Sequence, residues 1–160
     1  MRALVQRVKW ASVCVGGQEV SRIGIGLVVF LGIGRGDTVE DARYLCDKTV
    51  GLRILADAEG RFNHSALDIG VEMLIVSQFT LYADIRKGRR PSFVNAAPPD
   101  QAQEMFEVAV EMFRDTNLQV QVGRFQEYME VEVCNDGPVS IWLDSLERYR
   151  SRRRATNSFI

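Results

Sequence analysis

The balance between strand-like and helix-like segments constrains the fold of this chain more than any other feature. The sequence contains many short strand patterns, but only residues 37–50 and 100–115 repeat apolar side chains at helical spacing. A doubly wound parallel sheet would need helices alternating regularly with strands. The pattern therefore favours an α+β fold with antiparallel or mixed β-sheets, barrel-like, and two helices packed outside.

The strand patterns fall into two kinds. Gly16-Gly17 separates strand-like segments and predicts a hairpin turn. Apolar runs at 27–31 and 73–76 indicate buried strands, whereas alternating residues indicate half-buried strands at 119–122 and 129–133. Further short strands are expected at 52–55 and, after a break at 135–138, at 139–143.

The first helical segment carries its own start signal. Asp37 followed by Glu40 resembles a capping box, which predicts that the helix begins at Asp37. Cys46 falls on the apolar face of this helix, so its thiol is expected in the core.

Length and composition describe one domain and exclude several classes of protein. The chain has 160 residues, 46% of them hydrophobic, and a formal net charge of −1. Its longest apolar stretch, residues 23–34, is too short for the ~20 residues that a bilayer span requires. No secretory signal is visible at the start, so a cytoplasmic location is expected.

Cysteine and histidine usage argues against metal and redox chemistry. The three cysteines include no Cys-x-x-Cys pair, which makes a zinc ribbon or a thioredoxin-type centre a poor fit. His64 is the single histidine, whereas zinc hydrolases usually need several ligands. It is predicted to lie in a polar turn as an exposed loop residue.

Positive charge is concentrated in two places. Residues 147–160 form an Arg-rich C-terminal tail, expected to be flexible, beyond a single domain at 1–146. The second cluster lies in a predicted loop at 84–91. Such clusters attract phosphates, but composition alone favours a solvated surface. The loop cluster consists of Arg86, Lys87, Arg89 and Arg90.

Two short segments are the candidates for chemistry. The common phosphate-binding, nucleophile-elbow and zinc-hydrolase motifs are missing from the sequence, and the glycines at 32, 34 and 36 have the wrong spacing for a dinucleotide fingerprint. Residues 77–80 follow an apolar strand, where hydroxyl, amide and backbone N–H groups can rim a pocket. Residues 135–138 read first as a plain turn.

Together these segments carry a family resemblance. Ser77-Gln78-Phe79-Thr80-Leu81 and Asn135-Asp136-Gly137-Pro138-Val139 resemble the paired signature of the D-aminoacyl-tRNA deacylases. The segments at 3–8, 90–93 and 123–125 are similar to that family as well, so the resemblance runs from Met1 to about Leu143. Ser140 stands where the family usually has threonine, and the Arg-rich tail extends past the family's usual end.

The resemblance implies a function and a divided site. It implies a cytoplasmic homodimer that hydrolyses the ester between a D-amino acid and the 3′ adenosine of tRNA, a proofreading activity that needs no metal or organic cofactor. Gly137-Pro138, in cis and braced by Arg7, would project from the partner subunit. One wall of the site would be formed by Ser77, Gln78, Phe79 and Thr80, with Phe125 nearby.

The chemistry implied by this arrangement needs little from side chains. The carbonyls of Gly137 and Pro138 would bind the substrate's α-ammonium group and exclude L side chains, so D-amino acids and glycine would be accepted. Backbone N–H groups near Phe79 and Thr80 would stabilise the oxyanion, while the ribose 2′-OH of the tRNA helps to activate water. The other route makes Thr80 a nucleophile, although no base to activate it is evident.

The basic loop at 86–90 is the candidate for tRNA phosphate contacts in a D-aminoacyl-tRNA deacylase. Two other functions stay open at this stage. A related deacylase with a trans Gly-Pro bond would act on a mischarged L-aminoacyl-tRNA. A non-enzymatic nucleic-acid-binding module would use the basic loop and tail without turnover.

Overall fold

The structure is a computed structural model that describes residues 1–149. Eight strands, three α-helices and two short 3₁₀ helices (η) make up this part of the chain. In chain order they are β1 (Arg2–Val15), β2 (Gln18–Ile23), β3 (Gly26–Gly32), α1 (Val39–Gly51), β4 (Leu55–Ala56), β5 (Phe62–His64), α2 (Ala66–Ile69), β6 (Glu72–Ser77), η1 (Phe79–Tyr82), α3 (Pro99–Arg114), β7 (Val120–Val122), β8 (Glu130–Asp144) and η2 (Ser145–Tyr149).

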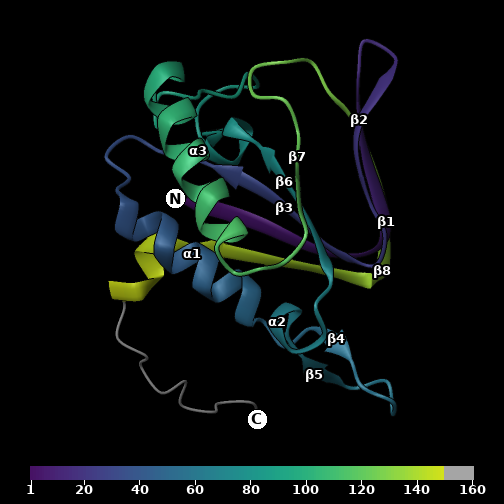
Figure 1. Cartoon of the computed structure of the whole chain (residues 1–160). Helices are drawn as coiled ribbons and strands as arrows, with labels where there is room; N and C mark the ends of the chain where they lie inside the picture. The colour runs from purple at the N-terminus through teal and green to yellow at the C-terminus, as the bar shows by residue number, and fades with distance from the viewer. Residues whose placement is uncertain (150–160) are drawn as a thin grey trace.

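The long strand β1 organises the main sheet. Along one edge it pairs antiparallel with β3 near its start and with β2 near its end, while β8 pairs antiparallel with it along its length. The sheet continues from β3 to β6 and β7 through parallel pairing, in the order β2-β1-β3-β6-β7. The result is a mixed, nearly closed, barrel-like sheet with α1 and α3 packed together on one side (Figure 1). The predicted α+β class is confirmed.

Two apolar clusters hold the sheet in place. The larger one lies between the sheet and the helices and joins Val5 of β1 to Leu45 of α1 and Phe113 of α3. The smaller one includes Val13 of β1 and Leu74 of β6. Adjacent residues of a strand point to opposite faces, so β3 supplies Val29 to the first cluster and Val28 to the second. Both faces of the central strands are therefore buried.

The two predicted helices are confirmed, but the first begins at a different cap. Thr38 is the N-cap residue of α1, and its capping box is completed by Asp41 instead of the predicted Asp37 and Glu40. Asp37 instead accepts hydrogen bonds from the α-amine of Met1 and the hydroxyl of Tyr82, both distant in sequence. Sequence spacing alone could not reveal these contacts.

Several predicted strand boundaries were wrong. The expected break at 135–138 is absent, because β8 continues through it as a bulge. The strand expected at 52–55 begins only at Leu55, and His64 is the half-buried last residue of β5 instead of an exposed loop residue. Cys46 is buried as predicted. Burial raises the pKa of its thiol to about 12, and the nearby carboxylates of Asp47 and Asp115 add to this increase.

The end of the described chain follows the sheet closely. Ser145 donates its backbone N–H to the carbonyl of Met1, and η2 begins there, so the predicted tail starts inside this element. The rest of the predicted tail, 150–160, lies outside the described residues. Within residues 1–149, no helix combines the length and apolar character needed to cross a bilayer.

Candidate functional site

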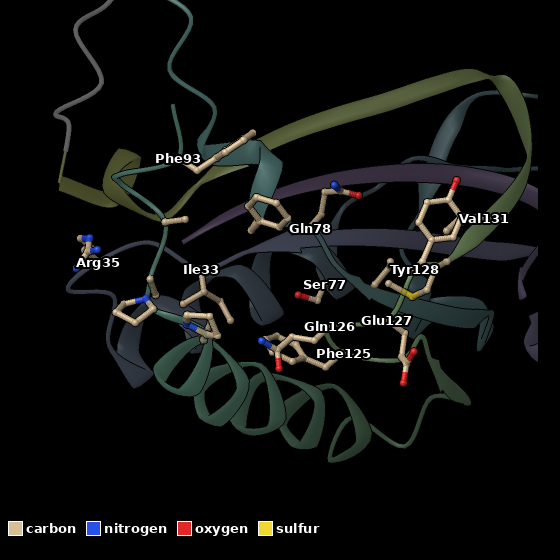
Figure 2. A pocket seen from close by; sticks show the side chains of 18 residues that line it. Ile33, Arg35, Ser77, Gln78, Phe93, Phe125, Gln126, Glu127, Tyr128 and Val131 are labelled. Atoms are coloured by element: carbon tan, nitrogen blue, oxygen red, sulfur yellow. The ribbon is translucent and has the colours of Figure 1, made fainter. Parts of the chain in front are cut away.

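A cavity of about 680 Å³ opens where β6 ends, between η1, the start of α3 and the segment that precedes β8. Figure 2 shows its lining, with Arg35 at one end and Tyr128 at the other, and Ser77 between them. Its volume falls in the range typical of small-molecule sites. The lining consists of Ile33, Arg35, Val76, Ser77, Gln78, Phe79, Phe93, Ala96, Ala97, Pro98, Pro99, Ala102, Phe125, Gln126, Glu127, Tyr128, Met129 and Val131.

The end of β6 places the first signature segment in this cavity. Ser77 is the last strand residue and pairs with Leu31 of β3, and Gln78 still donates its backbone N–H to the Leu31 carbonyl at 2.8 Å. The chain then turns into η1. Ser77, Gln78 and Phe79 all line the cavity, whereas Thr80 does not.

The start of η1 offers unused donors beside the cavity. Among the described residues, no hydrogen-bond acceptor is found for the backbone N–H of Phe79 or Thr80. Unpaired N–H groups are expected in the first turn of a helix. The hydroxyl of Thr80 instead accepts a short hydrogen bond from the side-chain amide of Gln78, which links the two side chains.

Aromatic side chains give the cavity its walls. Phe79 and Phe93 meet edge to face, with ring centroids 4.9 Å apart. On the opposite side, Phe125 leans against Phe106 of α3 at 5.8 Å, which anchors it to the core. Such edge-to-face and tilted pairs stabilise fixed ring positions. The cavity is therefore shaped before any ligand binds.

The cavity carries little charge. Among the described residues that line it, Arg35 and Glu127 are the only members of the Asp, Glu, Lys and Arg residue types, and none is a histidine. His64 lies in the β4–β5 hairpin instead. The cavity therefore offers few side chains for acid–base catalysis, whereas the backbone N–H groups of Phe79 and Thr80 are available as hydrogen-bond donors.

The second signature segment lies elsewhere, at a bulge between β1 and β8. Gln6 pairs with Ser140 and Val8 with Asn135, so Arg7 alone faces the four residues 136–139 of β8. A bulge of this kind bends the strand and exposes the extra residues. Both Gly137 and Pro138 are exposed, and neither lines the cavity of their own chain.

Arg7 fastens this bulge to the rest of the molecule. Its Nε donates to the carbonyl of Asp136 at 3.0 Å and lies 3.2 Å from the Asp136 carboxylate. Its Nη1 donates to the carbonyl of Ile54 at 2.7 Å, and the ring of Phe62 covers the guanidinium at 5.1 Å. Arg7 thus links the bulge to the segment that precedes β4.

Glycine is required at the tip of the bulge. Gly137 has a φ of +136°, and a Cβ built there would lie 2.8 Å from Val139 Cγ2 and 3.1 Å from Arg7 Nη2. The Gly137–Pro138 peptide bond is cis. The side chain of Asn135 closes the bulge by bonding both backbone groups of Val139. We call this unit, residues 135–139 with Arg7, the Arg7 corner.

The basic loop is exposed but not uniformly charged. Asp84 and Ser92 exchange backbone hydrogen bonds at its base. Arg86 is already paired with Asp84, and its hydrogen bonds lower the pKa of that carboxyl to about 2. The other cations of this loop, Lys87, Arg89 and Arg90, form no ion pair with the described residues.

Sequence reasoning missed most of the residues that line the cavity. Residues 96–102 reach it from the start of α3, and residues 126–129 reach it from the segment before β8. The Pro98-Pro99 pair was visible only as a helix start. A signal existed for Phe93 and Phe125, because both lie in the segments that carry the family resemblance.

Comparison with known proteins decides the family. The family model described as D-Tyr-tRNA(Tyr) deacylase matches residues 4–144. The chain belongs to this family. A D-aminoacyl-tRNA deacylase of Desulfitobacterium hafniense is 52% identical over 93% of this chain and 100% of its own length. Another from Roseiflexus sp. is 57% identical over 91% of this chain and 94% of its own.

Solved structures of similar fold carry two different names. One, named "c-Myc DNA Unwinding Element Binding Protein", is 41% identical with a TM-score of 0.85 and covers 90% of this chain and 98% of its own. The other, described as a probable eukaryotic D-amino acid tRNA deacylase, has a TM-score of 0.76 over 89% of this chain and 97% of its own. At 17% identity, the second supports the family's fold alone.

Proposed function

We propose that this chain hydrolyses the ester between a D-amino acid and the 3′ adenosine of tRNA, releasing the free amino acid and the tRNA. The supporting observation is the preformed cavity at the end of β6, lined by the signature residues Ser77, Gln78 and Phe79 of a deacylase family. Aminoacyl-tRNA is used by protein synthesis in the cytoplasm, which supports a cytoplasmic location as part of this proposal.

Hydrolysis would rely on the backbone of η1. Within residues 1–149 the N–H groups of Phe79 and Thr80 have no hydrogen-bond acceptor, and they would donate to the oxyanion of the tetrahedral intermediate. One such donor typically contributes ~10²–10³ in rate. The attacking water would be activated by the ribose 2′-OH, because no histidine lines the described cavity.

Thr80 does not look like an activated nucleophile. Its hydroxyl accepts a hydrogen bond from the Gln78 amide, which is a donor and takes no proton. An activated hydroxyl would need a base within hydrogen-bond reach. We infer that Thr80 positions Gln78 at the cavity edge.

Chirality would be read by the Arg7 corner of a partner subunit. The carbonyls of Gly137 and Pro138 would bind the α-ammonium group and leave no room for a side chain of L configuration. Many D side chains and glycine would pass such a filter, since it inspects only the α-carbon. The exposed corner is not part of its own chain's cavity, which supports a site completed by a second copy.

A homodimer would bury the apolar surface that the sheet leaves open. Leu4 of β1 stands opposite Phe30 of β3 and Trp142 of β8, so the three side chains share one face. Trp142 is 46% exposed, and the other two are half-buried. Tryptophan is enriched at protein interfaces. We propose that this face packs against its copy in the dimer.

The basic loop would hold the RNA without reading its sequence. Lys87, Arg89 and Arg90 are exposed and are our candidates for phosphate contacts, with Arg86 partly neutralised by Asp84. Phosphate contacts of this kind position a nucleic acid and carry no sequence information.

The decisive experiment is deacylation of tRNA charged with a D-amino acid, the matching L-amino acid or glycine. We expect release of the D-amino acid and glycine, with the L ester left intact. Ala102→Trp, which would fill the cavity, serves as a control against a contaminating deacylase. Turnover of the L ester alone would favour the related L-specific deacylase, and tRNA binding without turnover would favour a nucleic-acid-binding module.

A further inference from the structure

The turn after β3 carries the one cation among the described residues of the cavity wall, Arg35. Asp37 donates its backbone N–H to the carbonyl of Gly34 at 3.3 Å, and Gly36 has a φ of +80°. Residues 34–37 therefore form a tight turn in which glycine suits the third position. Arg35 occupies the first corner of that turn.

The turn is fixed from both sides. The backbone N–H of Gly34 and the hydroxyl of Tyr82 both donate to the Asp37 carboxylate, at 2.6 and 3.2 Å. The backbone N–H of Arg35 donates to the carbonyl of Asn95 at 3.0 Å. Arg35 is therefore presented by a rigid support.

The guanidinium of Arg35 is held at one nitrogen and free at the others. Its Nε donates to the carbonyl of Val94 at 2.7 Å. Among the described residues, no hydrogen bond or ion pair uses Nη1 or Nη2, and the residue is exposed. An arginine anchored in this way keeps its two terminal nitrogens in a plane suited to a phosphate.

Arg35 stands between two cavities. Besides the 680 Å³ cavity, it lines a polar cavity of about 460 Å³ whose walls include Asn95, Tyr82 and Thr38. The acidic groups of that second cavity are already engaged: Asp37 by the α-amine of Met1, and Asp41 by Arg148 and Thr38. Among the described residues, neither of these two carboxylates forms an ion pair with Arg35.

We propose that Arg35 binds the phosphate on the 5′ side of the tRNA's 3′-terminal adenosine, where the RNA strand leaves the site cavity toward the polar cavity. This proposal rests on the proposed function. A bound adenosine ester would fill the first cavity, so its 5′ phosphate must emerge at a rim. Arg35 marks the cationic end of the cavity in Figure 2, and Val94 and Asn95, which hold it, follow the basic loop in sequence.

The test compares two short substrates that differ by that phosphate. One is a D-aminoacyl adenosine without phosphate, and the other is a D-aminoacyl dinucleotide carrying one phosphate 5′ to the adenosine. We expect Arg35→Gln to lower kcat/KM on the dinucleotide about tenfold, mainly through KM, and to leave hydrolysis of the adenosine ester unchanged. Arg35→Lys should lose less activity on the dinucleotide than Arg35→Gln, because lysine keeps the positive charge but lacks the paired N–H donors of a guanidinium.

Arg53→Gln is the matched control. Arg53 is also exposed, and its Nε also donates to a backbone carbonyl at 2.7 Å, that of Asn63, but it does not line the cavity. It should behave as wild type on both substrates. Equal losses of Arg35→Gln on both substrates would indicate a merely structural role, and no loss on either would also overturn the proposal.

Binding of unesterified ligands separates this proposal from the proposed function. The wild-type protein should bind the dinucleotide more tightly than adenosine, and Arg35→Gln should remove that preference. If the wild type hydrolyses no ester, the proposed function fails, and the binding comparison still decides the role of Arg35. Equal preference in the wild type and Arg35→Gln would reject it.

Discussion

The cavity and the Arg7 corner both contain signature residues of the family, yet they are built in opposite ways. The cavity is concave, largely apolar and shaped by packed aromatic rings. The Arg7 corner is a bulge with an exposed tip, in which the Asp136 carbonyl is held by Arg7, whose side chain is 11% exposed. The cavity can enclose a ligand, whereas the corner can contact a ligand only from one side.

This difference teaches how a site can be divided within one sequence. The described cavity does not include Gly137 or Pro138 of its own chain, and both of these residues are exposed at the corner. In the proposed function, the cavity of one copy is completed by the corner of a second copy. Symmetric dimers meet this need, because each subunit offers both surfaces.

The largest expected effect comes from loosening the corner. Arg7→Ala removes charge-assisted bonds to Asp136 and Ile54, each worth ~1.5–3 kcal/mol, so the carbonyls of residues 137 and 138 lose their fixed direction. We expect kcat/KM for the D ester to fall about a hundredfold and rejection of the L ester to weaken.

Arg22→Ala is the control for that variant. Arg22 is also an arginine of the sheet with an aromatic neighbour, Trp10, but it forms an exposed ion pair with Glu19. It should keep wild-type activity and chiral preference, as exposed ion pairs contribute little. A wild-type D-to-L ratio in Arg7→Ala would show that the corner does not select chirality.

Local sequence patterns indicated the end of β6 but not the bulge in β8, and the reason is physical. Ser77, Gln78 and Phe79 are positioned by a local event, the end of an apolar strand, which a short sequence window contains. The bulge at 136–139 depends on how β8 pairs with β1, more than a hundred residues away in sequence. No local pattern encodes that register, so a turn was predicted there.

The capping of α1 shows the same limit on a smaller scale. Asp37 and Thr38 are both good cap residues, and local preference cannot separate neighbours. Met1 and Tyr82, both distant in sequence, donate hydrogen bonds to the Asp37 carboxylate, and Thr38 is the N-cap residue. The part of the cavity formed by residues 96–102 and 126–129 was missed for a similar reason, since only tertiary packing brings these segments to β6.

A smaller effect is expected from the basic loop, which belongs to neither region. Replacing Lys87, Arg89 and Arg90 together with glutamine should weaken tRNA binding about tenfold at moderate salt and reduce the salt-dependence slope by about 2. Arg86→Gln alone should change little, because Asp84 already neutralises Arg86. Titrations of tRNA at several salt concentrations measure both quantities. An unchanged slope in the triple variant would assign the RNA contacts elsewhere.

The smallest effect is expected from Thr80, beside the cavity. Thr80→Ala removes the hydroxyl that accepts from Gln78 but leaves the backbone N–H in place, so most of the deacylase activity should remain. Single-turnover rates on the D ester provide the measurement. Abolished turnover with intact tRNA binding would instead make Thr80 the nucleophile.

Subunit mixing tests the divided site most directly. Ala102→Trp should block the cavity but keep the corner, and Arg7→Ala should disable the corner but keep the cavity. If each site joins a cavity to the partner's corner, random mixing of the two inactive variants should restore about one quarter of wild-type activity on the D ester. A mixture no more active than the sum of its two components would contradict the account, because each subunit would then contain its whole site.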